Sequence, residues 1–276
     1  MGKSFKNFIS NKLNLISLII ISIFLLIAFL SRLGIIGANW NLEIGGSYES
    51  PSMKNIFGTD IFGRSVFQKV VKGTEVAMSV GVVVSLISIL VGSFLGIISG
   101  YFGGIIDDFL MWLYTTISSI PNAILLVSIA YIFGKGIFAI YIALSSNFWT
   151  EIFLFVRSEV IRHRDREYIQ AATALGAGHF RKIFRHILPN IMHIILIKFS
   201  MVFQQAIKSE VLLSYLGLGV TNMPSWGRMI DEAKIELMKG VWWQILFATS
   251  FMFLIVLSFN ILSDGIRVYL DPKIKK

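Results

Sequence analysis

Histidine is the residue type whose spacing in this chain first suggests chemistry. All four histidines lie within one short stretch, and His179 and His186 could share one face of a continuous helix. Two such imidazoles would suit a transition metal such as zinc. Glycines and Pro189 interrupt this stretch, however, and no carboxylate stands at a matching spacing. We therefore expect solvent-exposed histidines and no metal site.

Other catalytic arrangements are absent from the sequence or incomplete. Gly2-Lys3-Ser4 resembles the end of a nucleotide-binding loop, but the glycine and the strand that should precede it are missing. Neither the HExxH pattern of zinc proteases nor the GxSxG pattern of serine hydrolases occurs, and there is no cysteine. Asp107 and Asp108 follow two glycines, as acidic residues at the start of a helix do. We predict a non-catalytic chain that binds no cofactor of its own.

Charged and polar side chains inside apolar segments are a stronger functional signal. Such groups are costly in a membrane and mark solute or ion pathways. Glu151 and Lys208 are the clearest cases, and Gln204 should share a helix face with Lys208. If these side chains face a common interior, they would line a path for a polar solute, together with Glu210 and Ser214. The alternative is that Lys208 lies near the outer surface, where its long side chain reaches water.

The composition indicates the environment in which these residues must be positioned. The chain is 55% hydrophobic and 15% charged, whereas soluble domains contain about 45–50% apolar and about 25% charged residues. Its mean hydropathy is +0.74. The formal net charge of +9 fits Lys- and Arg-rich cytoplasmic loops better than nucleic-acid binding. We therefore predict an all-α polytopic membrane protein that contacts lipid and no nucleic acid.

Six segments approach the length of about 20 apolar residues that a spanning helix needs. They are residues 13–30, 76–98, 109–133, 136–156, 190–209 and 241–262. The first is predicted to be a retained anchor, because it is long for a signal peptide and lacks a small-residue cleavage site. In the third, Pro121 should kink a single helix. Six spans place both termini on one side, and the excess of Lys and Arg in the loops predicts that this side is cytoplasmic.

The second predicted span carries small residues at spacings of three and four. They include Gly81, Ser85, Gly92, Gly96 and Gly100. Small residues along one helical face let the backbone of another helix approach closely. We predict that this face serves helix packing and carries no chemistry.

Residues 167–190 read EYIQAATALGAGHFRKIFRHILPN and lie in the predicted cytoplasmic loop of residues 157–189. The alanines favour a short helix, and Gly176 and Gly178 would let the chain turn sharply. Pro189 should end this structure before the next span. Such an elbow could insert into a groove on a soluble partner.

This stretch resembles the EAA signature of the membrane subunits of ABC importers, which reads EAA, three residues, Gly, nine residues, then I-x-L-P. Residues 170–172 and Gly176 fit its first part, and residues 188–189 fit its end. Gln170 replaces the Glu of the signature, and His186 replaces the Ile. Further landmarks similar to those of C-type permease subunits of peptide and nickel transporters follow in order: residues 58–65, 99–104, 213–219, 224–227, 259–260, 264–267 and 270–272.

The resemblance implies a type I ABC importer permease fold in the cytoplasmic (inner) membrane. It implies as partners a homologous B-type permease, two ATPase subunits that use ATP and Mg, and an extracytoplasmic substrate-binding protein. The ATPase-coupling loop would include Gln170, Ala171, Ala172, Gly176, Ala177, Gly178, Arg181, Leu188 and Pro189. Residues 1–75 would then form an anchor helix with an extracytoplasmic segment, and residues 76–276 a permease core of five spans.

The function that the resemblance favours is a permease subunit for the import of dipeptides or oligopeptides. An importer of nickel or of a metal chelate shares the same landmarks and is the alternative. A stand-alone secondary transporter is a more distant alternative, because the paired broken helices of such proteins are not evident.

Overall fold

The computed structural model describes residues 11–270, so Gly2-Lys3-Ser4 and the end of the 270–272 landmark lie outside the described residues. Regular secondary structure in this range is helical, as predicted. In chain order the elements are α2 (Lys12–Arg32), α3 (Val66–Phe102), α4 (Gly104–Ser118), α5 (Asn122–Phe133), α6 (Ile137–Arg164), α7 (Glu167–Ala174), α8 (His179–Arg181), the π-helix η1 (Lys182–Ile187), α9 (Leu188–Tyr215), α10 (Trp226–Met238) and α11 (Trp243–Leu270).

Five helical segments within residues 11–270 are long and apolar enough to cross a membrane. They are α2, α3, α6, the continuous α8–η1–α9 segment and α11. Each overlaps one of the predicted spans and extends beyond it, because apolar runs mark the lipid-facing part of a helix and not its ends. α6 and α11 begin one and two residues after the predicted starts at 136 and 241. The five long helices confirm the prediction of a polytopic membrane protein.

The predicted third span is the exception. Residues 109–133 do not form one kinked helix, because α4 and α5 meet at 90°. Ser119 ends α4, and Pro121 occupies the N-cap of α5 with an extended backbone. Proline has no backbone N–H and disfavours helical geometry in the residue before it, so the bend is sharper than a kink.

α3 is longer than its apolar run, with 37 residues. At 1.5 Å per residue it is about 55 Å long, against a hydrocarbon core of about 30 Å. Its first turns carry charged residues and begin at Ser65, whose side-chain oxygen accepts a hydrogen bond from the backbone N–H of Gln68 at 3.3 Å. An N-capped polar extension is therefore continuous with the membrane-spanning part.

α3 and α6 pack closely along the small-residue face. A methyl group added at Gly92 would lie 2.6 Å from the Trp149 carbonyl oxygen, and one added at Gly96 would lie 2.8 Å from that of Phe153. At Gly100 the nearest atom is the carbonyl oxygen of Arg157, at 2.7 Å.

The remaining small residues of this face have other neighbours. Gly81 faces the ring of Phe203 in α9, and the buried hydroxyl of Ser85 bonds to the carbonyl of Gly81 in its own helix. The small residues of α3 therefore serve two contacts: Gly92, Gly96 and Gly100 pack against α6, and Gly81 packs against α9.

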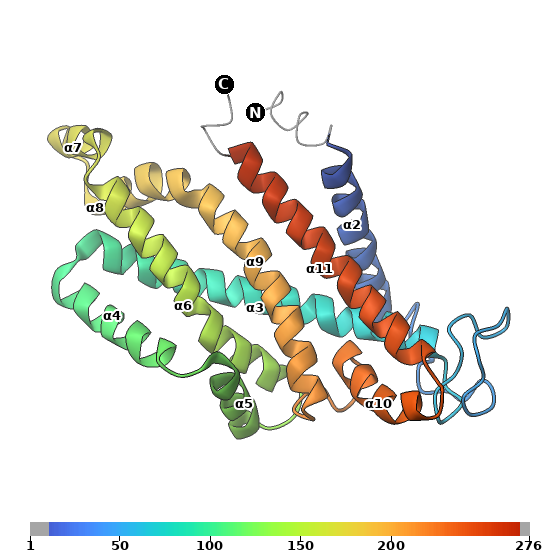
Figure 1. The fold of residues 1–276 in the computed structure, drawn as a ribbon. Helices are drawn as coiled ribbons and strands as arrows, with labels where there is room; N and C mark the ends of the chain where they lie inside the picture. The colour runs from blue at the N-terminus through green and yellow to red at the C-terminus, as the bar shows by residue number, and fades with distance from the viewer. Residues whose placement is uncertain (1–10, 271–276) are drawn as a thin grey trace.

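The direction in which α3 and α6 pack also determines how the chain runs between them. Residue numbers rise together along both helices, so α3 and α6 run in the same direction. The chain between them must return to the opposite end of the bundle, and α4 and α5 provide this return in two bent segments. Figure 1 shows the outcome: the start of α2, the end of α11 and α7 lie at one end, and residues 33–65 and α10 lie toward the other.

Candidate functional site

The charged segment between α6 and α9 folds as a helical elbow, residues 167–187, at one end of the bundle (Figure 1). α7 ends in a turn in which the N–H of Ala177 donates to the Ala172 carbonyl and the N–H of Gly176 donates to the Thr173 carbonyl, both at 2.9 Å. This is the Schellman motif, which needs a residue with positive φ after the helix. Gly176 supplies it, with φ of +79°.

The elbow has a buried side and an exposed side. Ile169 and Ala172 are buried against the bundle, whereas Gln170 and Ala171 are exposed. The exposed side also carries two large apolar residues, Leu175 and Phe180, with 87% and 74% of their surface accessible. Arg181 and Gly178 are exposed beside them, and Ala177 is half-buried.

The predicted helix end at Pro189 is wrong. α8, η1 and α9 form one continuous helical segment, and Pro189 is the second residue of α9, next to the half-buried Leu188. Within a regular helix the proline ring would clash with the carbonyl four residues earlier. The wider π-helical turn of η1 lies immediately before it, so the helix continues past the proline.

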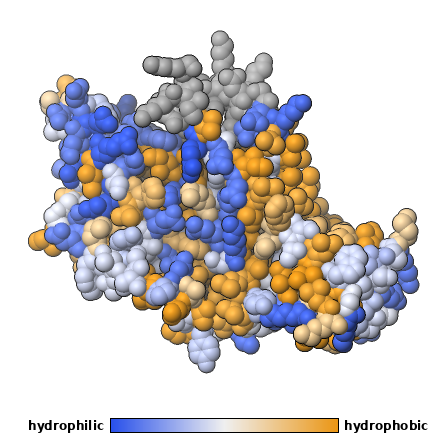
Figure 2. Space-filling model, viewed as in Figure 1, coloured by the Kyte–Doolittle hydropathy of each residue, from blue (hydrophilic) through white to orange (hydrophobic). Residues whose placement is uncertain are grey.

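An open polar cavity of about 320 Å³ lies between α5, α6 and α9. Its polar lining residues are Asn122, Asn147, Thr150, Glu151, Gln205, Lys208 and Ser209. Figure 2 shows that hydrophilic residues also gather over α7 and over the middle of the α6–α9 face, whereas hydrophobic residues cover α11 and α2. Polar lining is costly in this setting, so it points to contact with water or a polar solute.

Glu151 is held in this cavity by a residue that the sequence did not single out. Its Oε1 accepts a hydrogen bond from the Nζ of the buried Lys198 at 2.6 Å. The same ammonium lies 3.4 Å from the centre of the Phe155 ring. The ion pair fixes one carboxylate oxygen, and both charges face the α6–α9 side of the bundle.

The structure brings together only some of the predicted path residues. Glu151 and Lys208 line the same cavity, whereas Gln204 is buried outside it. Two residues along a helix correspond to about 200° of rotation, so Glu210 lies on the opposite side of α9 from Lys208. Glu210 is fully buried and accepts a hydrogen bond from the Ser214 hydroxyl at 2.6 Å.

Other lining residues were missed by the sequence argument. Asn122 and Asn147 are joined by a hydrogen bond of 2.6 Å. Gln205 and Ser209 lie beside Lys208 on α9. The helical spacing of Gln205, Lys208 and Ser209 was the available signal, because these positions are three and four apart.

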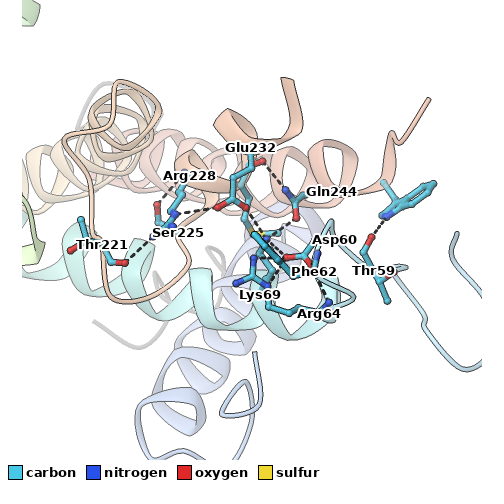
Figure 3. A network of polar contacts seen from close by, with 12 residues as sticks. Thr59, Asp60, Phe62, Arg64, Lys69, Thr221, Ser225, Arg228, Glu232 and Gln244 are labelled. Atoms are coloured by element: carbon cyan, nitrogen blue, oxygen red, sulfur yellow. Dashed lines mark hydrogen bonds and ion pairs between the residues drawn. The ribbon is translucent and has the colours of Figure 1, made fainter. Parts of the chain in front are cut away.

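A buried charge network lies at the other end of the molecule (Figure 3). Lys69 in α3 is 2% exposed, and its Nζ donates to Asp60 at 2.9 Å, to Glu232 of α10 at 2.8 Å and to Gln244 of α11 at 2.9 Å. Arg64 also binds Asp60, at 2.8 Å. Burial raises the pKa of the Asp60 carboxyl, but Lys69 and Arg64 outweigh it and hold that pKa below its ordinary value.

Glu236 of α10 lies close to this network and behaves differently. Its pKa is raised to about 7, mainly by burial and also by the carboxylates of Asp60 and Glu232, whereas Lys69 and Lys239 lower it. Among the described residues no group hydrogen-bonds its Oε2. The network thus contains one carboxyl group that takes up a proton near neutral pH.

Two of the four histidines lie within hydrogen-bond distance of tyrosine hydroxyls. The Nδ1 of His179 lies 2.9 Å from the Tyr101 hydroxyl, and the Nδ1 of His163 lies 2.7 Å from that of Tyr168. Within residues 11–270 no three His, Asp or Glu side chains are grouped so that they could hold a metal ion. Asp107 instead pairs with Arg157, with both its oxygens 2.6 Å from guanidinium nitrogens.

Comparison with known proteins supplies the context for these features. A family described as "Binding-protein-dependent transport system inner membrane component" matches residues 92–276, which include the elbow, the polar cavity and α10. This chain belongs to that family of transport permeases.

Named relatives of this transport permease match it over nearly its whole length. It is 32% identical to the oligopeptide transport system permease protein OppC of Bacillus subtilis, over 98% of this chain and 88% of that protein. It is 34% identical to the dipeptide transport system permease protein DppC of Alkalihalophilus pseudofirmus, over 99% and 90% respectively. A glutathione transport system permease protein, GsiD of Pectobacterium atrosepticum, is 30% identical over 82% and 75%. The permease is therefore a multi-pass protein of the cell membrane.

Proposed function

We propose that this chain is the C-type membrane subunit of an ATP-driven importer of short peptides. The observation that carries the proposal is its similarity, over 98% and 99% of its length, to permease proteins named for oligopeptide and dipeptide transport. The chain forms part of the path and catalyses no reaction. It binds no cofactor of its own, and ATP and Mg are used by partner subunits.

The polar cavity is the part of this path that the chain contributes. Glu151 offers a carboxylate and Lys208 an ammonium to the same space. Peptides carry an ammonium and a carboxylate at their ends, so a lining with both signs of charge suits them. The cavity opens to the α6–α9 face, which a homologous B-type permease would cover to complete the path.

The elbow is the contact with the ATPase subunits. Its exposed apolar residues Leu175 and Phe180 suit the groove of a soluble partner, and the backbone turn at Gly176 fixes their direction. The last part of the elbow, α8 and η1, runs into α9 without a break. A displacement of the elbow therefore moves α9 and the Lys208 end of the cavity with it. Closure of the ATPase subunits would thereby change access to the path.

The fold is that of a type I importer permease with both termini in the cytoplasm. The start of α2, the end of α11 and the elbow lie at one end of the bundle (Figure 1), which supports a common side for all three. Residues 33–65 and α10 then face the extracytoplasmic substrate-binding protein.

Reconstitution of the complete importer tests this function. The chain would be co-expressed with its candidate B-type, ATPase and binding-protein partners and placed in liposomes, and labelled di- or tripeptides would be added outside them. We expect ATP-dependent peptide uptake in the wild-type assembly. Leu175→Asp should lose the ATPase subunits on affinity purification, because it places a charge on the apolar docking side.

The outcomes separate the parts of the proposal. Uptake of a nickel chelate but not of peptides would overturn the substrate assignment. Normal co-purification and transport by the Leu175→Asp importer would overturn the coupling role of the elbow. Uptake by the purified chain alone, driven by an ion gradient, would make it a secondary transporter.

A further inference from the structure

A second cavity, also of about 320 Å³, lies beneath the elbow. It is open to the surface and is lined by the end of α3, the end of α6, α7, α8 and the start of η1. Its polar lining residues are Tyr101, Arg164, Gln170, Thr173, His179 and Lys182. No Asp or Glu of residues 11–270 lines it. The transport function described above makes no use of this cavity.

Lys182 is the residue that makes this cavity unusual. It is 9% exposed, and its Nζ bonds to the Thr173 hydroxyl at 3.3 Å. No carboxylate in the part of the chain that the structure describes lies within 4.0 Å of this ammonium. A buried cation without a counter-ion is unfavourable, so an anion in the adjoining cavity would stabilise it.

A second cation and several polar side chains line the same space. Arg164 contributes a second positive charge from α6, with Nη1 bonded to the Gly100 and Tyr101 carbonyls at 3.2 and 3.3 Å. The Tyr101 hydroxyl, which bonds to His179, and the Gln170 amide, which donates to the Asp165 carbonyl at 3.3 Å, line the cavity beside these cations. The Thr173 hydroxyl accepts from Lys182 and donates to the Ile169 carbonyl at 2.8 Å. The only carboxylate bound to Arg164 is the exposed Asp165 next to it in sequence, among the described residues.

The charge and the size of the cavity define the ligand class. Two cationic side chains match the charge of a phosphate group, which is about −1.5 to −2 near neutral pH. The two cations reach the cavity from different elements, Arg164 from α6 and Lys182 from η1. Small-molecule pockets range from about 300 to 1,000 Å³, and this one lies at the lower limit.

We propose that the cavity beneath the elbow is a binding site for a phosphate group. The bound group bridges α7 to the ends of α3 and α6 and thereby stiffens the elbow. It comes either from a free phosphate compound or from the headgroup of an anionic phospholipid, since the exposed Phe102 at the cavity mouth could contact an acyl chain. The cytoplasmic origin of the ligand rests on the proposed orientation of the chain, whereas the binding itself does not.

The test uses the full-length chain in nanodiscs of pure phosphatidylcholine, titrated with inorganic phosphate by calorimetry. A second preparation contains one-fifth phosphatidylglycerol, and native mass spectrometry counts the lipids retained per chain. We expect one phosphate, or one retained phosphatidylglycerol, per chain. Lys182→Gln should weaken this binding at least tenfold, and Lys182→Arg should restore it because it keeps the charge.

Arg162→Gln is the matched control, because Arg162 is an exposed cation of the same end of α6 that does not line the cavity. Binding of phosphate in pure phosphatidylcholine identifies a free anion, and retention of phosphatidylglycerol alone identifies a lipid. Equal binding by the wild-type chain and Lys182→Gln, equal loss in Arg162→Gln, or no binding in either preparation overturns the proposal. None of these readouts depends on peptide transport, so failure here is distinct from failure of the proposed function.

Discussion

Single residues carry buried charge in this permease, and each is held by partners from distant parts of the chain. Lys69 joins the loop before α3 to α10 and α11, and Lys198 of α9 holds Glu151 of α6. Removing one member of a fully buried pair leaves the other uncompensated. The behaviour of these residues under titration and substitution can therefore be predicted individually.

Glu236 should make stability depend on pH. Its folded-state pKa of about 7 lies above the ordinary value of 4.5, so the folded protein holds the proton more tightly than the unfolded chain between these values. The free energy of unfolding therefore falls as pH rises from 4.5 through 7, by at most about 3 kcal/mol. Glu236→Gln cannot ionise and should melt at a higher temperature than wild type at pH 8, but at a similar temperature at pH 5.

The control for Glu236 is Asp231→Asn on the same helix, because the Asp231 side chain is 41% exposed and pairs, among the described residues, with the exposed Lys234 alone. It should change the melting temperature little at either pH. If Glu236→Gln and the wild-type protein show the same difference between pH 5 and pH 8, the carboxyl group does not titrate in this range.

Glu151 should affect which peptides are carried. Glu151→Gln removes the negative charge from the cavity and leaves the buried Lys198 without its carboxylate partner. We expect the lost attraction between this carboxylate and a cationic peptide to cost about 1 kcal/mol, which corresponds to a factor of about 5. Uptake of Lys-containing peptides should therefore fall about fivefold relative to acidic ones. Competition uptake assays measure this ratio. Glu159→Gln is the control, because Glu159 lies on the same helix but pairs with Arg162 outside the cavity, and it should leave the ratio unchanged. If Glu151→Gln also leaves the ratio unchanged, Glu151 is not part of the path.

At the scale of elements, the elbow depends on one backbone conformation. Gly176 has φ of +79° and open space around it, so alanine there would meet no neighbour but would adopt a strained backbone. The strain costs about 1–2 kcal/mol and should reduce ATP-dependent uptake by the Gly176→Ala importer about fivefold or more. Gly178→Ala is a matched control, because Gly178 has the ordinary φ of −69° and equally open surroundings. Equal activity of the two variants would show that the turn geometry does not matter for coupling.

The contact of α3 with α6 should be equally specific. A side chain at Gly96 would meet the carbonyl oxygen of Phe153, which cannot move without separating the helices. We expect Gly96→Val to lower the free energy of unfolding by about 1–3 kcal/mol, measured as a fall in the melting temperature in detergent. Leu90→Val, on an exposed side of α3, should have little effect. A Gly96→Val protein as stable as the wild type would contradict the close approach.

Local patterns account for the features that could be predicted from the sequence. Apolar runs predicted the long helices, and the ordered landmarks predicted the permease family. The partners of Lys69 could not be predicted, because Asp60, Glu232 and Gln244 are far apart in sequence. The polar start of α3 and the π-helical turn before Pro189 could not be predicted for a related reason. Both depend on contacts or backbone adjustments that hydropathy does not record.

At the scale of the whole molecule, the absence of cysteine from the sequence makes the orientation directly testable. Met53 and Leu175 are highly exposed and lie in residues 33–65 and in the elbow. With both termini in the cytoplasm, a membrane-impermeant maleimide should label Met53→Cys in cells with an intact inner membrane. It should label Leu175→Cys only after lysis. The unsubstituted chain is the control for background, and the reverse labelling pattern would mean that the proposed orientation is inverted.

The length of α3 has a mechanical consequence for the molecule. Near one end of this unbroken helix, Lys69 binds residues of α10 and α11. Near the other end, the Gly100 carbonyl accepts a hydrogen bond from Arg164 of α6, beside the elbow. A rod of about 55 Å that rotates by 5° about one end moves its other end by about 5 Å. α3 can therefore act as a lever arm, which converts a small tilt at the elbow into an ångström-scale stroke at the opposite membrane surface.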